Sequence, residues 1–119
     1  MKLLIEDSGV SDEQGRPAHF IKIFKIPLIA RAALAGVRVG ADAVIFETNA
    51  DEEQKSEVKK IFQKFDRLNG KVEIKPLGTT NGDGIIKVKS NEVFADGALL
   101  GNSGFRAEIR STSDAKAAQ

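Results

Sequence analysis

The chain has 119 residues and a near balance of charge, with 18 basic and 17 acidic side chains and a formal net charge of +1. Apolar residues make up 41% of it, which suits one globular domain and excludes a disordered chain. With no cysteine and one histidine, it cannot form a disulfide, a thiolate metal site or a two-histidine metal site within one chain.

The N-terminal third predicts two strands. The short apolar run within Lys2–Glu6 predicts a first strand, and a polar loop over 7–18 follows it. Glu6 and Asp7 make the segment acidic too early for a secretory signal peptide. His19 has no recognisable serine or carboxylate partner, and we expect it at the surface or at a strand edge. Phe20–Ile26, rich in β-branched and aromatic residues, predicts an interior strand. Charges interrupt the apolar region 20–46, which excludes a membrane span and favours a soluble, cytoplasmic protein.

Two helices alternate with a further strand in the middle of the chain. Leu28–Ala35 is alanine-rich and closed by Gly36, which predicts a first helix. Ala43–Phe46 predicts a short interior strand. Asn49, with Glu52 three residues later, predicts the start of a second helix that ends at Asn69-Gly70. Its apolar face repeats at helical spacing through Val58, Ile61, Phe62, Phe65 and Leu68.

Short strands with turn signals follow Lys71. The loop Gly78–Gly84 is expected to join two of them, and Asp96-Gly97 predicts a two-residue hairpin. Residues 111–119 are small and polar and predict a disordered C-terminal tail. The pattern predicts a single domain over 1–110 of the α/β (α+β) class. We expect a two-layer sandwich with two helices on a mixed sheet, in the order β-βαβαβ followed by an antiparallel meander.

Three of these strands sort their charge onto one face. Strand side chains alternate between faces, so one face takes the apolar residues Val72, Ile74, Ile86, Val88, Phe105, Ala107 and Ile109. The other face takes Lys71, Lys75, Lys87, Lys89, Arg106 and Arg110, against only Glu73 and Glu108. If the three strands share a sheet, its open face is cationic, and the six basic residues are candidates for binding nucleic acid or another anion. The competing interpretation is a solvated surface that discourages edge-to-edge association.

Other signals are weaker. The loop Gly78–Gly84 could bind an anion through backbone N–H groups, but it opens no helix with Lys-Ser/Thr and is not a P-loop. Thr79, Asn81 and Asp83 alternate as calcium ligands do, without the distal glutamate of an EF-hand, so turn formation is the better interpretation. The chain has no tyrosine or tryptophan, and its phenylalanines fall mostly on expected core positions, which leaves little for base stacking.

The βαβαββ order over roughly residues 20–89 is similar to that of the Alba family of chromatin and RNA-binding proteins. The resemblance is one of topology, and it implies nucleic-acid binding through a basic segment near the start of the first helix. Only Lys25, ahead of Ile26-Pro27-Leu28-Ile29, matches that segment.

No nucleophile, base and orienting group can be named together, so the sequence predicts no enzyme, catalytic residue, metal ligand or cofactor. We expect a small non-enzymatic module that binds a protein partner or a second copy of itself. The alternative is a nucleic-acid-binding protein that uses the cationic face.

Overall fold

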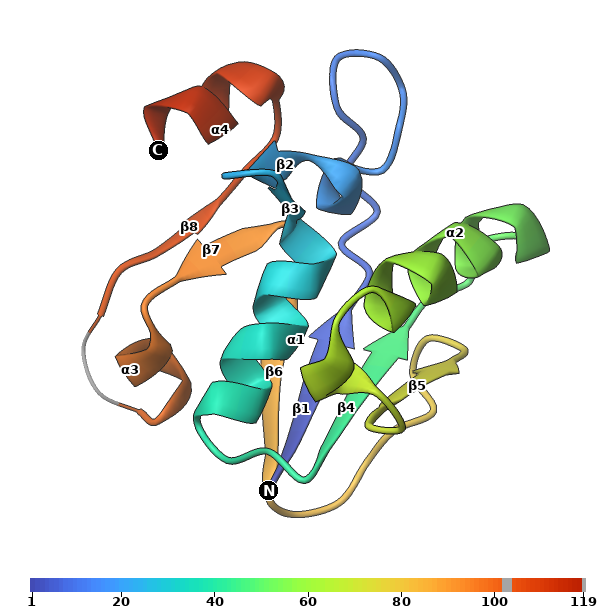
Figure 1. The fold of residues 1–119 in the computed structure, drawn as a ribbon, viewed down its shortest axis with the longest axis vertical. Coiled ribbons are helices and arrows are strands. Elements are labelled where there is room, and N and C mark those ends of the chain that lie inside the picture. Colours follow the sequence, from blue (N-terminus) through green and yellow to red (C-terminus); the bar gives the residue numbers. More distant parts are fainter. Residues whose placement is uncertain (102–103, 119) are drawn as a thin grey trace.

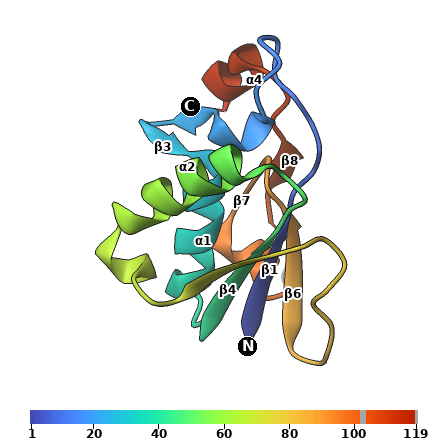
Figure 2. The same cartoon turned by 90° about the vertical axis from the view of Figure 1, so that its right-hand side faces the viewer.

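A four-stranded parallel sheet organises the chain in the computed structural model, which describes residues 1–101 and 104–118 (Figure 1). In spatial order the strands are β5 (Val72–Lys75), β4 (Ala43–Glu47), β1 (Lys2–Glu6) and β6 (Ile85–Lys89). Two helices, α1 (Leu28–Arg38) and α2 (Glu52–Gln63), cover one face of the sheet (Figure 2). The predicted α/β class is confirmed. The main sheet is parallel throughout, and two separate two-stranded sheets are antiparallel.

The order of the strands dictates how the chain crosses the sheet. The β1–α1–β4 and β4–α2–β5 units both step towards the β5 edge with their helices on one face. Crossovers between parallel strands are right-handed, so the return from β5 to β6 has to use the opposite face. Residues 76–84 make this return without a helix, on the side of the sheet away from α1 and α2 (Figure 2). The loop Gly78–Gly84 is therefore a crossover and not a hairpin.

Both faces of the central strands are buried. Leu3, Ile5 and Phe46 belong to the core that lies between the sheet and the helices, together with Ile29 of α1 and Phe62 of α2. Leu4 and Ile45 alternate with these residues along their strands and so lie on the opposite face, where they are also buried. Strands β1 and β4 are apolar on both faces for this reason, as expected of interior strands in a parallel sheet.

The predicted interior strand over Phe20–Ile26 is wrong. The segment forms the 3₁₀ helix η1 (Ala18–Phe20) and a small hairpin of β2 (Lys22–Ile23) and β3 (Ile26–Pro27). Phe24 and Lys25 at its tip have φ values of 49° and 68°, which turn the chain back on itself. The segment forms a separate hairpin, so the strand order behind the Alba resemblance is not found. Ile21 and Ile23 of this segment pack in a second core cluster, whose other members are Ala18, Leu28, Ile109 and Ala115.

Helix α1 begins at Leu28 as predicted but continues beyond Gly36 to Arg38. Gly40, with a φ of 97°, is the glycine that follows its end. Gly36 is buried inside the helix because β1 passes close to it: a Cβ at this position would lie 2.5 Å from Leu3 Cδ2. The glycine is needed for close packing of the helix on the sheet.

The start of α2 differs by two residues from the prediction. Asp51 is the N-cap, and its side chain accepts a hydrogen bond from the Gln54 backbone N–H. Asn49 instead accepts a bond from the Leu77 N–H in the crossing segment. The helix ends at Gln63, and the 3₁₀ helix η2 (Asp66–Leu68) follows. The predicted apolar face still packs into the core, with Val58, Phe62 and Leu68 buried there.

The C-terminal third departs furthest from the prediction. Asp96-Gly97 is not a hairpin turn but the start of the short helix α3 (Asp96–Leu99), because Leu99 is buried in the core and Asp96 is paired with Arg38. Strand β7 (Glu92–Phe94) instead pairs with β8 (Arg106–Glu108). Phe105, expected on a buried face, is 62% exposed.

The expected disordered tail over 111–119 contains the helix α4 (Thr112–Ala117), and Gln119 lies outside the described residues. Ser111 caps this helix by accepting from the Asp114 N–H. Ala115 is buried in the second core cluster, and Thr112 donates two kinds of bond to the Glu13 carboxylate, from its N–H and its hydroxyl. Within the described residues, no helix is long and apolar enough to cross a membrane.

We expect Gly36→Ala to destabilise the protein. Alanine gains about 1 kcal/mol in helix propensity, whereas overpacking a core costs about 1–3 kcal/mol. Leu3 is fully buried and has no room to move away, so the second effect should win and leave a net loss of about 1 kcal/mol or more. Urea unfolding measures the change.

Leu3→Val provides the control, because valine lacks the δ-methyl that a Cβ at position 36 would meet. The double variant should lose less stability than the sum of the two single variants. A Gly36→Ala protein as stable as the wild type would contradict the close approach.

Candidate functional site

The carboxyl edge of the parallel sheet, where α/β proteins most often bind ligands, is occupied by polar groups that bond to one another. The Thr48 hydroxyl donates to Asp7 Oδ2 at 2.6 Å, and the Gly9 N–H donates to Asp7 Oδ1 at 3.0 Å. The Ser8 N–H donates to Ser90 Oγ at 3.1 Å. Thr48 and Ser90 are both buried. Asp7, Thr48 and Ser90 therefore bond within the chain, whereas the buried Thr80 Oγ1 of the crossing segment and Asn91 Oδ1 after β6 have no hydrogen-bond partner in the described part of the chain.

His19 lies beneath this edge and not at the surface as expected, with only 2% of the residue exposed. Its ring meets those of Phe20 and Phe46 at centroid distances of 4.5 and 5.4 Å, and its Nδ1 lies 3.9 Å from Asp7 Oδ1. Burial lowers the pKa of His19 to about 4, against an opposing effect of the Asp7 charge. In the described part of the chain no serine or threonine hydroxyl bonds to His19, so it does not form a nucleophile–base pair.

The crossing segment does bind an anion through its backbone, and that anion is the carboxylate of Glu47. The Gly78 N–H donates to Oε1 at 3.0 Å and the Thr80 N–H donates to Oε2 at 2.7 Å. Burial alone would raise the pKa of Glu47, but the bonds from Thr80 and Gly78 outweigh it and the pKa is lowered. Together with the bond from Leu77 N–H to Asn49, these bonds hold the crossing segment on the sheet.

The six basic residues predicted as a cationic face do not belong to one sheet. Lys71 and Lys75 lie at the β5 edge, Lys87 and Lys89 lie on β6 at the opposite edge, and the buried Glu47 lies between them in the sheet. Arg106 belongs to β8, which pairs with β7 in a different sheet. Arg110 follows β8 and precedes α4.

Four of these six residues already have a carboxylate partner. Lys75 lies 3.8 Å from Glu73, and Arg110 lies 3.1 Å from Glu108. Lys89 lies 3.7 Å from Glu108, and Arg106 forms a two-point pair with Glu92. Only Lys71 and Lys87 make no ion pair among the described residues. Two of the six predicted residues thus remain without an ion pair in the described part of the chain.

Glu92 and Arg106 have a further effect on the β6 edge of the sheet. Glu92 Oε1 accepts from the Lys89 N–H at 2.6 Å, and Arg106 Nη2 donates to the Lys87 carbonyl at 3.3 Å. The side-chain pair thus bonds to backbone groups of β6 in the way a neighbouring strand would. This edge is closed to another strand.

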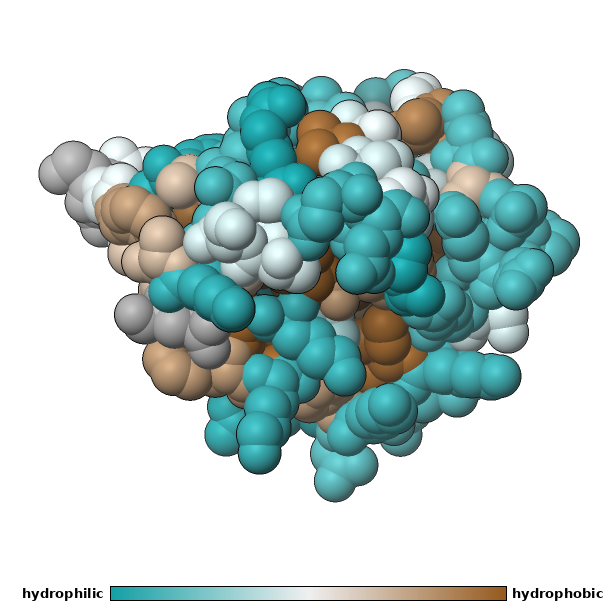
Figure 3. Space-filling view, turned by 90° about the horizontal axis from the view of Figure 1, so that it is seen from above, coloured by the Kyte–Doolittle hydropathy of each residue, from teal (hydrophilic) through white to brown (hydrophobic). Residues whose placement is uncertain are grey.

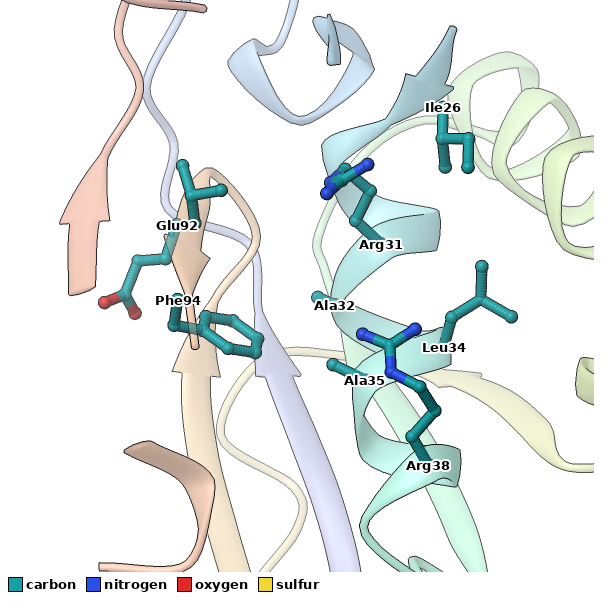
Figure 4. A pocket seen from close by; sticks show the side chains of 9 residues that line it. Ile26, Arg31, Ala32, Leu34, Ala35, Arg38, Glu92 and Phe94 are labelled. Carbon is teal, nitrogen blue, oxygen red and sulfur yellow. The ribbon is translucent and has the colours of Figure 1, made fainter. Parts of the chain in front are cut away.

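A small cavity lies between α1 and β7, with a volume of about 90 Å³. Arg31, Ala32, Ala35 and Arg38 line it from the helix, and Phe94 from the strand (Figure 4). Arg31 donates to the Ile23 carbonyl and Arg38 is paired with Asp96, so neither guanidinium is available to a ligand. The cavity is also well below the roughly 300–1,000 Å³ of ligand pockets.

Five basic residues line a groove between the β2–β3 hairpin and α2, about 360 Å³ in volume. We call it the basic groove. Its basic residues are Arg16, Lys22, Lys25, Lys60 and Lys64, and its apolar residues are Phe20, Pro27, Ile61 and Phe65. The end of the molecule that carries this hairpin is covered mostly by hydrophilic side chains, with apolar surface showing between them (Figure 3).

The charge of the basic groove is largely uncompensated. Glu57 is the single carboxylate lining it, and Arg16 Nη2 binds this group at 2.6 Å while its guanidinium lies 4.9 Å from the centre of the Phe20 ring. The four lysines make no ion pair among the described residues, and all four are exposed. An anionic ligand here would meet several unpaired ammonium groups at once.

The hairpin tip beside the groove has an unusual backbone. Positive φ at both central residues of a two-residue hairpin turn is normally supplied by Asn-Gly or a similar pair, and here Phe24 and Lys25 adopt it. Such strain occurs preferentially at functional sites. The turn presents Phe24, which is 65% exposed, next to a groove lysine.

No family model matches this chain, and no curated protein does. Among the described residues, no group of three or more His, Cys, Asp or Glu side chains could hold a metal ion. The chemistry of the surface is therefore the basis for a functional proposal, and the basic groove is its most distinctive feature.

The sequence did not point to the basic groove because its residues come from three separate segments. Lys22 and Lys25 alternate with apolar residues in a stretch that predicts an interior strand, and Lys60 and Lys64 occupy the solvent side of an amphipathic helix. The i, i+4 spacing of Lys60 and Lys64 is the one local signal, since it places both on the same helical face.

We expect Glu47→Gln to loosen the crossing segment. Glutamine would turn an amide donor towards one of the two N–H donors, and hydrogen bonds to a charged group are worth about 1.5–3 kcal/mol. Amide exchange at Gly78 and Thr80 should accelerate. The loss of stability should be largest above the usual carboxyl pKa and should shrink as the pH falls through the lowered pKa of Glu47, where the wild-type carboxylate is itself protonated.

Glu6→Gln is the matched control, because Glu6 is the register partner of Glu47 on β1. Its amide exchange and its unfolding midpoint in urea should stay close to the wild type. Unchanged exchange at Gly78 and Thr80 in the Glu47 variant would show that the carboxylate does not hold the segment.

His19 should make the fold sensitive to mild acid. The unfolded state takes up a proton near the usual histidine pKa of 6.5, whereas folded His19 does so only near 4. Stability from this residue is therefore complete above pH 6.5 and declines by about 3 kcal/mol as the pH falls to 4. Urea unfolding of the wild type and of His19→Leu at several pH values measures this. A wild type that loses no more stability than the leucine variant over this interval would refute the assignment.

Proposed function

We propose that this protein is a non-enzymatic module that binds the phosphate backbone of nucleic acid in the basic groove. The observation that carries the proposal is the set of four exposed lysines with no ion pair, together with Arg16, around one groove. This keeps the alternative expected from the sequence but moves its site from the sheet to the β2–β3 hairpin and α2.

The shape and lining of the groove support a linear polyanion. Lysines stand on both walls, Lys22 and Lys25 on the hairpin, Lys60 on α2 and Lys64 at the C-cap of α2, so a chain of phosphates could be contacted from two sides. Phe20 and Phe65 add apolar surface between the charges. A strand of nucleic acid offers both a charged backbone and flat bases to such a lining.

The exposed Phe24 supports single-stranded over double-stranded nucleic acid. Its ring is mostly accessible and lies between two groove lysines in the sequence, where an unpaired base could stack on it. The sequence suggested that aromatic rings were in short supply, because the hairpin that exposes Phe24 was not foreseen.

A binding role fits the internal bonding of the sheet edge. Asp7, Thr48 and Ser90 bond to other groups of the chain, and Glu47 is held by the crossing segment. General acid–base chemistry needs groups that can reach a substrate proton. The groups at this edge are engaged elsewhere, which favours binding without catalysis.

We expect labelled single-stranded DNA and RNA to bind with a steep dependence on salt. About four phosphate contacts predict a loss of roughly 50- to 150-fold in affinity between 50 and 200 mM salt. Lys25→Gln with Lys64→Gln removes one lysine from each wall, and the salt dependence should fall by about half. Fluorescence anisotropy at both salt concentrations measures affinity, and circular dichroism checks the fold.

Lys71→Gln with Lys87→Gln is the matched control, since it removes two exposed lysines that form no ion pair and lie outside the groove. It should bind as the wild type does. Loss of binding in this control alone would return the site to the sheet, and no binding at 50 mM salt would overturn the proposal.

A further inference from the structure

The two edges of the main sheet differ. At the β6 edge, the Glu92–Arg106 pair bonds to the Lys87 carbonyl and the Lys89 N–H. At the other edge, no strand in the described part of the chain pairs with the outer side of β5. Proteins usually obstruct exposed edges, and here one edge is blocked while the other is left open.

The backbone of β5 shows which groups face outwards. The Lys71 and Lys75 carbonyls accept bonds from the Val44 and Thr48 N–H groups, at 2.8 and 2.9 Å. Because the bonding direction alternates along a strand, Val72 and Ile74 direct their N–H and C=O groups away from β4. These groups are available to another strand.

Apolar surface adjoins the open edge. A groove of about 260 Å³ runs between α2 and β5 and is lined by Phe62, Leu68, Val72 and Ile74 among other residues. Val72 and Ile74 are only half-buried although they pack against the core. A strand added at this edge would cover both side chains.

We propose that β5 pairs antiparallel with β5 of a second copy of this chain, about a twofold axis at Ile74. In this register Ile74 lies opposite Ile74 of the second copy, and the two residues exchange their outward N–H···O bonds. Glu73 lies opposite Lys75 on both sides of the axis, so the pairing is self-complementary in charge. Val72 N–H meets the Pro76 carbonyl, and proline limits the ladder beyond that point.

The charges select this register over its neighbour. Centring the axis on Glu73 would place Glu73 opposite Glu73 and Lys71 opposite Lys75 twice, which are all like-charge pairs. Both registers allow four backbone hydrogen bonds, because the N–H groups of Val72 and Ile74 donate in each; the acceptors are the Ile74 and Pro76 carbonyls in the first register and the Val72 and Ile74 carbonyls in the second. Opposite charges directly across an antiparallel pair are stabilising and like charges are destabilising.

The dimer would join both sheets with both helical layers on the same face. A twofold axis perpendicular to the sheet leaves α2 of each copy beside the joint. The residues of the basic groove lie on the hairpin, on the loop before it and on α2, and none of them is in β5. The inference is therefore independent of the proposed function.

Sedimentation equilibrium of the full chain over about 1 µM to 1 mM tests the dimer. The wild type should change from monomer to dimer with concentration. Lys75→Glu and Glu73→Lys each replace two attractive pairs by repulsive ones and should raise the dimer dissociation constant at least about tenfold. Both side chains are solvent-accessible, so circular dichroism and the melting temperature should show an intact fold.

The double variant Glu73→Lys with Lys75→Glu is the decisive control, because it exchanges the charges and restores complementarity. It should dimerise as the wild type does. A wild type that stays monomeric to 1 mM would overturn the proposal. So would tighter association of Lys75→Glu, which the Glu73-centred register predicts, or failure of the double variant to recover.

Discussion

The carboxylate of Glu47 is the interaction on which the arrangement of this molecule depends. The chain has to return from the β5 edge to the β6 edge across the face opposite the helices, and it does so with no helix of its own. The backbone N–H groups of a segment without regular secondary structure need other hydrogen-bond acceptors. Glu47 provides two, for Gly78 and Thr80. One buried charge thus takes the place of the crossover helix that such returns usually contain.

This solution has consequences for where function can lie. Parallel α/β sheets usually bind ligands at their carboxyl edge. Here Glu47 at this edge binds the crossing segment, and the Asp7 carboxylate accepts a bond from the Thr48 hydroxyl. Charge left without a partner is found instead at the β2–β3 hairpin and α2. The sheet contributes a different property, one blocked edge and one open edge. The proposed ligand binding and the proposed self-association therefore use separate surfaces, and variants can test each without altering the other.

The elements that the sequence predicted well are those whose pattern is decided locally. The strands at Lys2–Glu6 and Ala43–Glu47 carry the continuous apolar runs 3–5 and 43–46, and the apolar face of α2 repeats at helical spacing. Predictions failed where distant contacts outweighed local preference. Leu99 enters the core as part of a helix and so prevents the Asp96-Gly97 hairpin, and the glycine at position 36 marks the close approach of Leu3 and not the end of the helix. The segment that resembles a strand is a hairpin, because Phe24 and Lys25 adopt positive φ values and reverse the chain.

The sequence by itself determined the α/β class, the buried central strands and the alternation of charge along β5 and β6, since each follows from residue spacing along one segment. Only the tertiary structure decided which charges remain free. Ion pairs with carboxylates are formed by Lys75, Lys89, Arg106 and Arg110. The lysines that line the basic groove form no ion pair among the described residues. Ion pairs and grooves join segments far apart in the chain, and the path that brings such segments together depends on the packing of the whole core.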